Sequence, residues 1–146
     1  MRRIVAIVVV ALLLVGCSQQ DPFEDLSDGS CTRMLGDSVD THISGQIDAL
    51  AQKDWELAYS FASDDFRSNV AIDNFTVIVY AQYSMLIENT GYEFNDCIVT
   101  KGLITQEVSV TSGEQVFDLT YTLTVNESTL GVDSAVISSS ITPIDA

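Results

Sequence analysis

The chain has 146 residues, of which 21 are Asp or Glu and only six are Lys or Arg, so its formal net charge is −15. A surface of this charge repels nucleic acid and anionic lipid head groups, which excludes both as partners of the folded part. The sequence contains no D-x-D-x-D-G loop of the kind that binds calcium. We therefore interpret the acidity as a source of solubility outside the cell.

The first residues have the pattern of an export signal. Two arginines precede an unbroken apolar run at residues 4–15, which is too short for a stable membrane span. The run ends in Leu14-Val15-Gly16-Cys17, which resembles the lipobox of bacterial lipoproteins, where cleavage before the cysteine follows acylation of its thiol. The resemblance predicts that Cys17 carries lipid and anchors the protein to the cell membrane, on the extracytoplasmic side. The alternative is an ordinary signal peptide followed by a chance cysteine.

Removal of residues 1–16 would leave 130 residues, the length of one domain with a single core. Four basic and 21 acidic residues would remain, which gives a formal charge of −17. Residues 18–30 are polar, acidic and turn-forming, as expected of a flexible tether. We therefore predict a signal peptide at 1–16, a lipidated cysteine and tether at 17–30, and a single domain at 31–146.

Two further cysteines, Cys31 and Cys97, remain for other roles. In an exported, oxidising setting a disulfide between them is the expected state, and it would close a loop of about 66 residues. The alternative is a reactive thiol, which requires a histidine or a basic neighbourhood to favour the thiolate. Only Arg33 lies near either cysteine in the sequence, so we prefer the disulfide.

The clearest helical periodicity occupies residues 40–66 and includes the only tryptophan. A first helix is predicted from an apolar stripe made of Ile43, Ile47, Leu50 and Ala51. Because a charge on this stripe is costly to bury, Asp54 is predicted to be the N-cap of a second helix. The apolar face of that helix comprises Trp55, Ala58, Tyr59 and Ala62. A capped turn at residues 63–67 would then point Phe66 inward.

Residues 73–91 are predicted to form one further helix. Their β-branched run at 76–79 would suit a strand, but the apolar residues follow a helical period. Asp73 is the expected cap of this helix. Its apolar face comprises Phe75, Ile78, Val79, Gln82, Tyr83, Leu86 and Ile87.

The second half of the chain is predicted to form four strands, at residues 92–100, 103–111, 115–125 and 135–142, with a loop at 126–134. The third strand alternates most clearly, with Phe117, Leu119, Tyr121, Leu123 and Val125 on one face. Its other face carries Asp118, Thr120, Thr122 and Thr124. The expected fold is α+β, with N-terminal helices packed on the apolar face of a curved antiparallel sheet of about four strands.

The order of these elements and two short patterns resemble a known superfamily. The patterns are ALAQKDWELAYSFASDDFR at residues 49–67 and F-x-x-x-V-x-x-x-Y at Phe75, Val79 and Tyr83. Over residues 40–141 the chain resembles the cone-shaped nuclear-transport-factor-two-like (cystatin-like) superfamily. Within it, the chain is similar to an uncharacterised bacterial domain family whose opening combines an alanine-rich helix, an aspartate, A-Y-x-x-A-S and a phenylalanine.

The sequence predicts no metal site, no cofactor and no catalytic residue. His42 is the only histidine, and no second ligand has helical or strand spacing to it, so we expect a solvated surface residue. A Gly-rich phosphate loop, a G-x-S-x-G elbow and an H-E-x-x-H pair are all absent from the sequence. Asn126-Glu127-Ser128 fits the glycosylation sequon, but we interpret it as a turn.

The resemblance implies a pocket between helices and sheet, where ketosteroid-isomerase-like members of the superfamily use an aspartate and a tyrosine. The groups available for such a pocket are Trp55, Tyr59, Tyr83, Asp118 and Tyr121. Their spacing fits core packing at least as well. One hypothesis is therefore a non-enzymatic binding module of the cell envelope, for a small apolar ligand or an envelope protein. The other is a small-molecule enzyme of the isomerase or hydratase kind. The absence of a paired acid and base motif favours the first.

Overall fold

The structure is a computed structural model that describes residue 16 and residues 19–141. The rest of the predicted signal peptide and the predicted lipidation site Cys17 lie outside the described residues. The elements in chain order are β1 (Gly29–Ser30), α1 (Arg33–Ala51), α2 (Trp55–Ser60), α3 (Asp64–Asn69), α4 (Ile72–Gln82), α5 (Ser84–Ile87), β2 (Gly91–Thr100), β3 (Leu103–Ser112), β4 (Gln115–Asn126) and β5 (Thr129–Ile141). Within the described ranges, no helix has both the length and the apolar character needed to cross a membrane.

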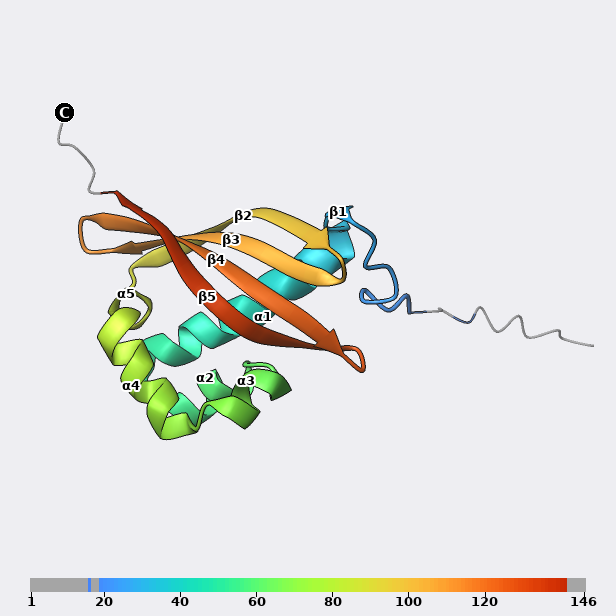
Figure 1. The fold of residues 1–146 in the computed structure, drawn as a ribbon. Coiled ribbons are helices and arrows are strands. Elements are labelled where there is room, and N and C mark those ends of the chain that lie inside the picture. The colour runs from blue at the N-terminus through green and yellow to red at the C-terminus, as the bar shows by residue number, and fades with distance from the viewer. Residues whose placement is uncertain (1–15, 17–18, 142–146) are drawn as a thin grey trace, which may run out of the picture.

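The strands form a five-stranded antiparallel sheet in the order β1-β2-β3-β4-β5, and helices α1 to α5 lie on one side of it (Figure 1). This is the predicted α+β class, with helices followed by an open antiparallel sheet. The predicted number of about four strands is too low. In the missed strand, β1, Gly29 and Ser30 pair with Val99 and Ile98, and two residues are too few to show a period.

The segment predicted as a tether makes ordered contacts at its C-terminal end. Besides the pairing of β1, the Asp28 carboxylate accepts a hydrogen bond of 2.7 Å from the Lys101 N–H. Phe23 and Leu26 pack against the hydrophobic core. Ordered contacts with the domain therefore begin before Cys31, the residue at which the domain was predicted to start.

Helix α1 is longer than the sequence predicted. It begins at Arg33 and is capped by Thr32, whereas the stripe suggested a start near Asp40. The first turns of α1 were not predicted, because they contain weak helix formers such as Gly36. Ala51 was wrongly placed on the apolar stripe, since it is exposed at the end of the helix. The buried apolar stripe comprises Leu35, Val39, Ile43, Ile47 and Leu50.

The two predicted caps after α1 are confirmed. The Asp54 carboxylate accepts a hydrogen bond of 3.1 Å from the Leu57 N–H at the start of α2. The Ser63 hydroxyl oxygen accepts one of 3.0 Å from the Phe66 N–H at the start of α3. Each bond satisfies a backbone donor that has no partner within its own helix. The chain can therefore turn twice within a short distance and bring both small helices beneath β5 (Figure 1).

The single helix predicted for residues 73–91 is wrong. The structure has two helices, α4 and α5, separated at Tyr83, whose φ of −126° and ψ of 30° are not helical. The change of direction buries Met85, which the single-helix prediction left off the apolar face. Asp73 is not the cap, because α4 begins after Ala71. A helical period cannot reveal this break, because Tyr83 is held by a contact with a distant strand.

The predicted loop at residues 126–134 is also wrong, because β5 begins at Thr129. Asn126 pairs with Thr129, and the intervening Glu127 and Ser128 form a tight turn with φ values of 48° and 63°. Positive φ at both central residues suits the twist of an antiparallel hairpin, but such turns usually contain glycine. The interpretation of Asn126-Glu127-Ser128 as a turn is confirmed.

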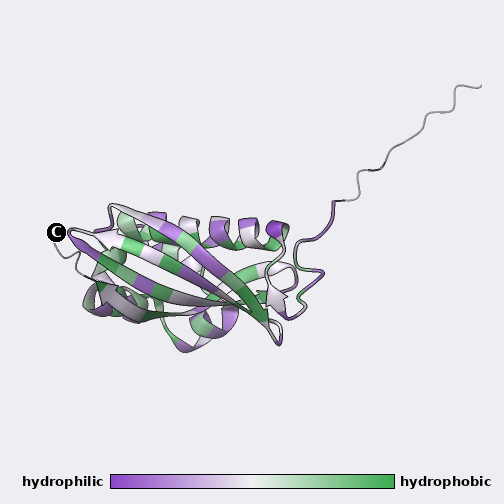
Figure 2. Ribbon diagram, turned by 90° about the horizontal axis from the view of Figure 1, so that it is seen from above, coloured by the Kyte–Doolittle hydropathy of each residue, from purple (hydrophilic) through white to green (hydrophobic). Residues whose placement is uncertain are grey.

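The hydrophobic core lies between the helices and one face of the sheet. On β4, Leu119, Tyr121 and Leu123 are buried, whereas Thr120 and Thr122 on the other face are only partly covered. Figure 2 shows the strands with hydrophobic and hydrophilic residues in alternation along their length. The strand register predicted for β4 is therefore confirmed.

Cys31 and Cys97 form the predicted disulfide, with their Cα atoms 5.4 Å apart. The Cys31 N–H also donates a hydrogen bond of 2.9 Å to the Cys97 carbonyl. Because α1 begins two residues after Cys31, the bond ties the start of this helix to β2.

Candidate functional site

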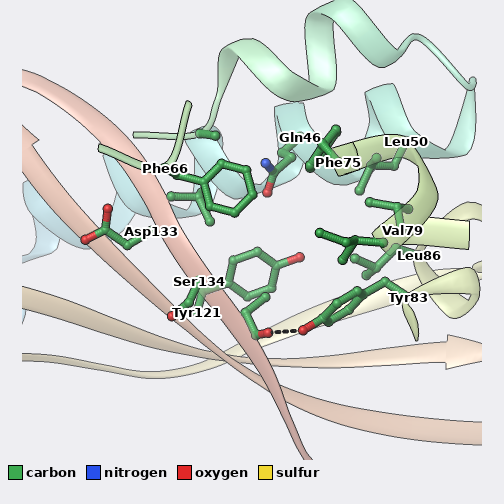
Figure 3. A pocket seen from close by; sticks show the side chains of 14 residues that line it. Gln46, Leu50, Phe66, Phe75, Val79, Tyr83, Leu86, Tyr121, Asp133 and Ser134 are labelled. Carbon is green, nitrogen blue, oxygen red and sulfur yellow. Dashed lines mark hydrogen bonds between the residues drawn. The ribbon is translucent and has the colours of Figure 1, made fainter. Parts of the chain in front are cut away.

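A cavity of about 170 Å³ lies between the helices and the β4–β5 hairpin (Figure 3). Its wall is mainly apolar, and α1, α3, α4, α5 and β5 all contribute large side chains to it. The principal apolar contributors are Leu50, Phe66, Phe75, Val79, Leu86 and Val132. An apolar interior with a small number of polar groups is the usual composition of a pocket for a small molecule.

The most unusual group in this cavity is the hydroxyl of Tyr121. The side chain is 1% exposed, and no residue that the structure describes forms a hydrogen bond with the hydroxyl. Burial, with smaller effects from Tyr83 and Tyr92, raises the pKa of Tyr121, so the phenol keeps its proton. A buried hydroxyl without a partner costs about 1–3 kcal/mol. Tyr121 therefore presents a donor that no described residue of the protein satisfies.

Gln46 of α1 supplies a second polar group to the same wall. Its side chain is 5% exposed, and its Nε2 donates a hydrogen bond of 3.2 Å to the Ala58 carbonyl. This bond fixes which way the amide faces, because only the nitrogen can donate to a carbonyl. In Figure 3 the amide oxygen lies on the side of the cavity that holds Tyr121. Within the described part of the chain, the hydrogen bond to Ala58 is the one that this side chain makes.

Tyr83 closes the cavity on another side, and its hydroxyl proton has a partner. Its hydroxyl donates a hydrogen bond to the carbonyl of Ala135 on β5, drawn as a dashed line in Figure 3. The bond links the break between α4 and α5 to the strand that forms the opposite wall. Tyr83 therefore acts as a structural clamp, and its hydroxyl proton is already engaged.

The wall formed by β5 is fixed to the connector between α2 and α3. The Ser63 N–H donates a hydrogen bond of 2.9 Å to the Val132 carbonyl, and the Val132 N–H donates one of 2.9 Å to the Phe61 carbonyl. Gly131 lies so close to this connector that an added Cβ would stand 2.5 Å from the Ser63 Cα. Only glycine allows the two segments to approach this closely.

Three of the five predicted pocket residues lie elsewhere. The Tyr59 hydroxyl donates a hydrogen bond of 2.6 Å to the Val70 carbonyl, and it also lies 3.1 Å from the Arg67 carbonyl oxygen. The Trp55 ring packs on Tyr80, with the ring centroids 5.0 Å apart. Tyr59 and Trp55 therefore hold the short helices together, which agrees with the interpretation of both as packing residues.

Asp118, the third of these residues, lies on the face of β4 opposite to Tyr121. Its carboxylate accepts hydrogen bonds from the hydroxyls of Ser109, at 2.6 Å, and Ser139, at 2.7 Å. These bonds lower the pKa of Asp118, so it is ionised at neutral pH. The structure thus brings Tyr83 and Tyr121 together in the cavity, but it does not bring Asp118 to either of them.

Two polar residues that line the cavity, Gln46 and Asp133, were not predicted as pocket residues. A signal for Gln46 was present, because it follows Ile43 by three residues and precedes Leu50 by four, and so falls on the buried stripe. Asp133 stood in the segment that was predicted to be a loop. In Figure 3 its carboxylate is at the outer edge of the cavity, directed away from the Tyr121 hydroxyl.

His42 is not the solvated surface residue that was predicted. It is half-buried, its Nε2 lies 2.8 Å from the Phe61 carbonyl oxygen, and the two rings meet edge to face. Burial lowers the pKa of His42. The prediction failed because α1 begins earlier than expected, which places His42 in mid-helix beside the α2–α3 connector. Among the residues described, no cluster of three or more His, Cys, Asp or Glu side chains is suited to hold a metal ion.

Together these features define a small α+β domain whose helices and open antiparallel sheet enclose an apolar pocket. The chain belongs to the family described as Domain of unknown function (DUF4864), whose model matches residues 35–139. The matched range runs from the first turn of α1 to β5 and so includes every element that lines the cavity. Comparisons with curated proteins and with solved structures gave no match.

Proposed function

We propose that the protein is a lipid-anchored lipoprotein on the extracytoplasmic side of the cell membrane, and that its domain is a non-enzymatic module that binds a small, mainly apolar molecule. The main support for the binding role is the apolar cavity, in which the buried hydroxyl of Tyr121 has no partner among the described residues. The motif ending at Cys17 supports the anchor. Helices on one side of an antiparallel sheet, with a pocket between the layers, support membership of the nuclear-transport-factor-two-like superfamily.

The arrangement of charges favours binding over catalysis. An enzyme of the isomerase or hydratase kind needs a base within reach of the substrate that the tyrosine holds. Asp118 lies on the other face of the sheet, and the Asp133 carboxylate points away from the Tyr121 hydroxyl. The described lining also contains no Lys, Arg or His. A bound molecule would therefore be held by burial and hydrogen bonds, and we propose that no side chain of the described lining is placed to move its protons.

Native mass spectrometry of the full chain purified from its own host tests the binding role. We expect a retained molecule of roughly the size of benzene or slightly larger, because an apolar cavity of about 150 Å³ can hold benzene. The matched control is Ala135→Leu, which adds bulk to the partly exposed wall and should abolish retention. Retention of the same molecule by Ala135→Leu would contradict a site in this cavity. A stoichiometric protein partner without any small molecule would instead support the hypothesis of an envelope protein as the partner.

The anchor is tested by Cys17→Ala. Without a thiol to acylate, the variant should either be released or remain unprocessed with its apolar run attached. Fractionation of cells followed by intact-mass measurement distinguishes these products from the acylated chain. A variant that still carried acyl groups and sedimented with membranes would show that the lipid is attached elsewhere.

A further inference from the structure

We infer that the cavity recognises a hydroxyl group, and that its ligand is a neutral, mainly apolar molecule of roughly seven non-hydrogen atoms, judged from the benzene-sized capacity of such cavities. The ligand hydroxyl accepts a hydrogen bond from Tyr121 and donates one to Gln46. This inference rests on the proposed function, because it names the class of molecule that the same pocket binds.

The Tyr121 hydroxyl is the donor of the proposed site. Tyr121 is buried to 99% of its surface, and its hydroxyl has no partner among the described residues. The neighbouring Tyr83 already donates its proton to the Ala135 carbonyl and does not donate to Tyr121. Nearly all buried hydroxyls in folded proteins are paired. A ligand oxygen in the cavity would supply the acceptor that Tyr121 lacks.

The amide oxygen of Gln46 is the acceptor of the proposed site. The bond from Gln46 Nε2 to the Ala58 carbonyl leaves the amide oxygen facing the cavity wall near Tyr121 (Figure 3). A carbonyl oxygen can only accept, so its partner must be an O–H or N–H group. A hydroxyl is the smallest neutral group that accepts from Tyr121 and donates to Gln46 through one atom. A ketone or an ether would satisfy only the tyrosine.

The charge of the site argues against anionic and cationic ligands. The described lining carries no cation, and the chain has a formal net charge of −15, so a carboxylate or phosphate would be both unpaired and repelled. An ammonium group could donate to Gln46 and to the Tyr121 oxygen, but it cannot accept, so the Tyr121 proton would still lack an acceptor. A neutral hydroxyl supplies both an acceptor for the Tyr121 proton and a donor for the Gln46 amide oxygen.

The test is a titration of the full chain in an uncharged detergent, followed by the amide NMR spectrum. The four probes are cyclohexanol, cyclohexanone, methylcyclohexane and cyclohexylammonium, which share one ring and one substituent atom. One net hydrogen bond corresponds to roughly a threefold to tenfold change in affinity. We therefore expect cyclohexanol to bind about threefold to tenfold more tightly than cyclohexanone, and cyclohexanone to exceed methylcyclohexane by a similar factor. The same titrations of Ala135→Leu in the same detergent serve as the reference. This variant should not bind the probes in the cavity, so any change in its spectrum reports partition of the probe into micelles.

Two variants assign the bonds to their residues. Tyr121→Phe removes a hydroxyl that bonds to no described residue. It should reduce the affinities for cyclohexanol and cyclohexanone about threefold to tenfold and leave the affinity for methylcyclohexane unchanged. Gln46→Leu should reduce only the affinity for cyclohexanol, to the level of cyclohexanone. Tyr59→Phe is the matched control, because it removes a hydroxyl outside the cavity and should change no affinity.

The outcomes separate this inference from the proposed function. Equal binding of the three neutral probes would leave an apolar binding pocket in place and overturn hydroxyl recognition. Preferential binding of cyclohexylammonium would also overturn it, in favour of a cationic ligand. If none of the probes shifted the amide signals of the cavity residues, the binding role of the pocket would fail together with this inference.

Discussion

Replacing Leu119 by Ala should lower the free energy of unfolding by about 2–5 kcal/mol, whereas Thr120→Ala should change it by less than about 1 kcal/mol. Leu119 is fully buried on the core face of β4, and it pairs with Val108 of β3, which is also fully buried. The cost therefore combines the lost burial of the side chain with the cavity that it leaves. Thr120, one residue along, lies on the opposite and partly exposed face.

Urea unfolding of both variants and of the unchanged chain measures this difference, provided that the dependence on denaturant is linear and the slopes agree. The comparison isolates the effect of the face, because Leu119 and Thr120 are neighbours in one strand and their side chains lie on opposite faces of the sheet. Equal losses of stability in the two variants would show that the register of β4 against the core is wrong. In that case the assignment of Tyr121 to the cavity would be wrong too, since it shares a face with Leu119.

The second large effect is expected from the double substitution of Cys31 and Cys97 by Ser. The disulfide closes a loop of 66 residues, and the chain-entropy model gives about 4 kcal/mol of stabilisation for a loop of this length. The loss arises mainly in the unfolded chain, which becomes free to expand. Because small domains have total stabilities of about 5–15 kcal/mol, the variant should unfold at a much lower urea concentration.

Intact-mass measurement after alkylation without reductant provides the direct check. Cys31 and Cys97 of the native chain should take up no alkyl group, and both should react after reduction. Reduction of the unchanged chain should also reproduce the stability of the Cys31→Ser, Cys97→Ser chain, which controls for effects of the serines themselves. Alkylation of both thiols in the native chain would contradict the bond.

The parts of the fold that the sequence predicted correctly depend on short-range order. The caps at Asp54 and Ser63 each need one side chain and a donor three residues later, and the pattern of β4 needs only alternation. The failures depend on contacts between distant segments. The helix break at Tyr83 accompanies a hydrogen bond to β5, 52 residues away. Strand β1 forms by pairing with β2, which is distant in the sequence.

The candidate site was also predicted only in part. Tyr83 and Tyr121 were both named, but nothing in their spacing shows that one hydroxyl finds a partner on β5 and the other finds none. Asp118 was named as an acid available for the pocket that the resemblance implies, although alternation along β4 sends its side chain and that of Tyr121 to opposite faces. Gln46 was overlooked because its polarity conceals a position on the buried stripe. A hydrogen-bonding deficit is a property of the assembled fold, and a sequence pattern does not record it.

The close approach of Gly131 to Ser63 has a consequence for the energetics of association. The β5 wall of the cavity is held by two backbone hydrogen bonds and by a contact that leaves no room for a side chain, so its shape is set when the chain folds. An incoming ligand would meet a preorganised surface and would not have to immobilise this segment. Ordering of a loose segment on binding costs conformational entropy, and the backbone of this wall avoids that cost. The affinity of this site should therefore depend strongly on how well the shape of the ligand matches the cavity, because the β5 wall cannot readily change its shape.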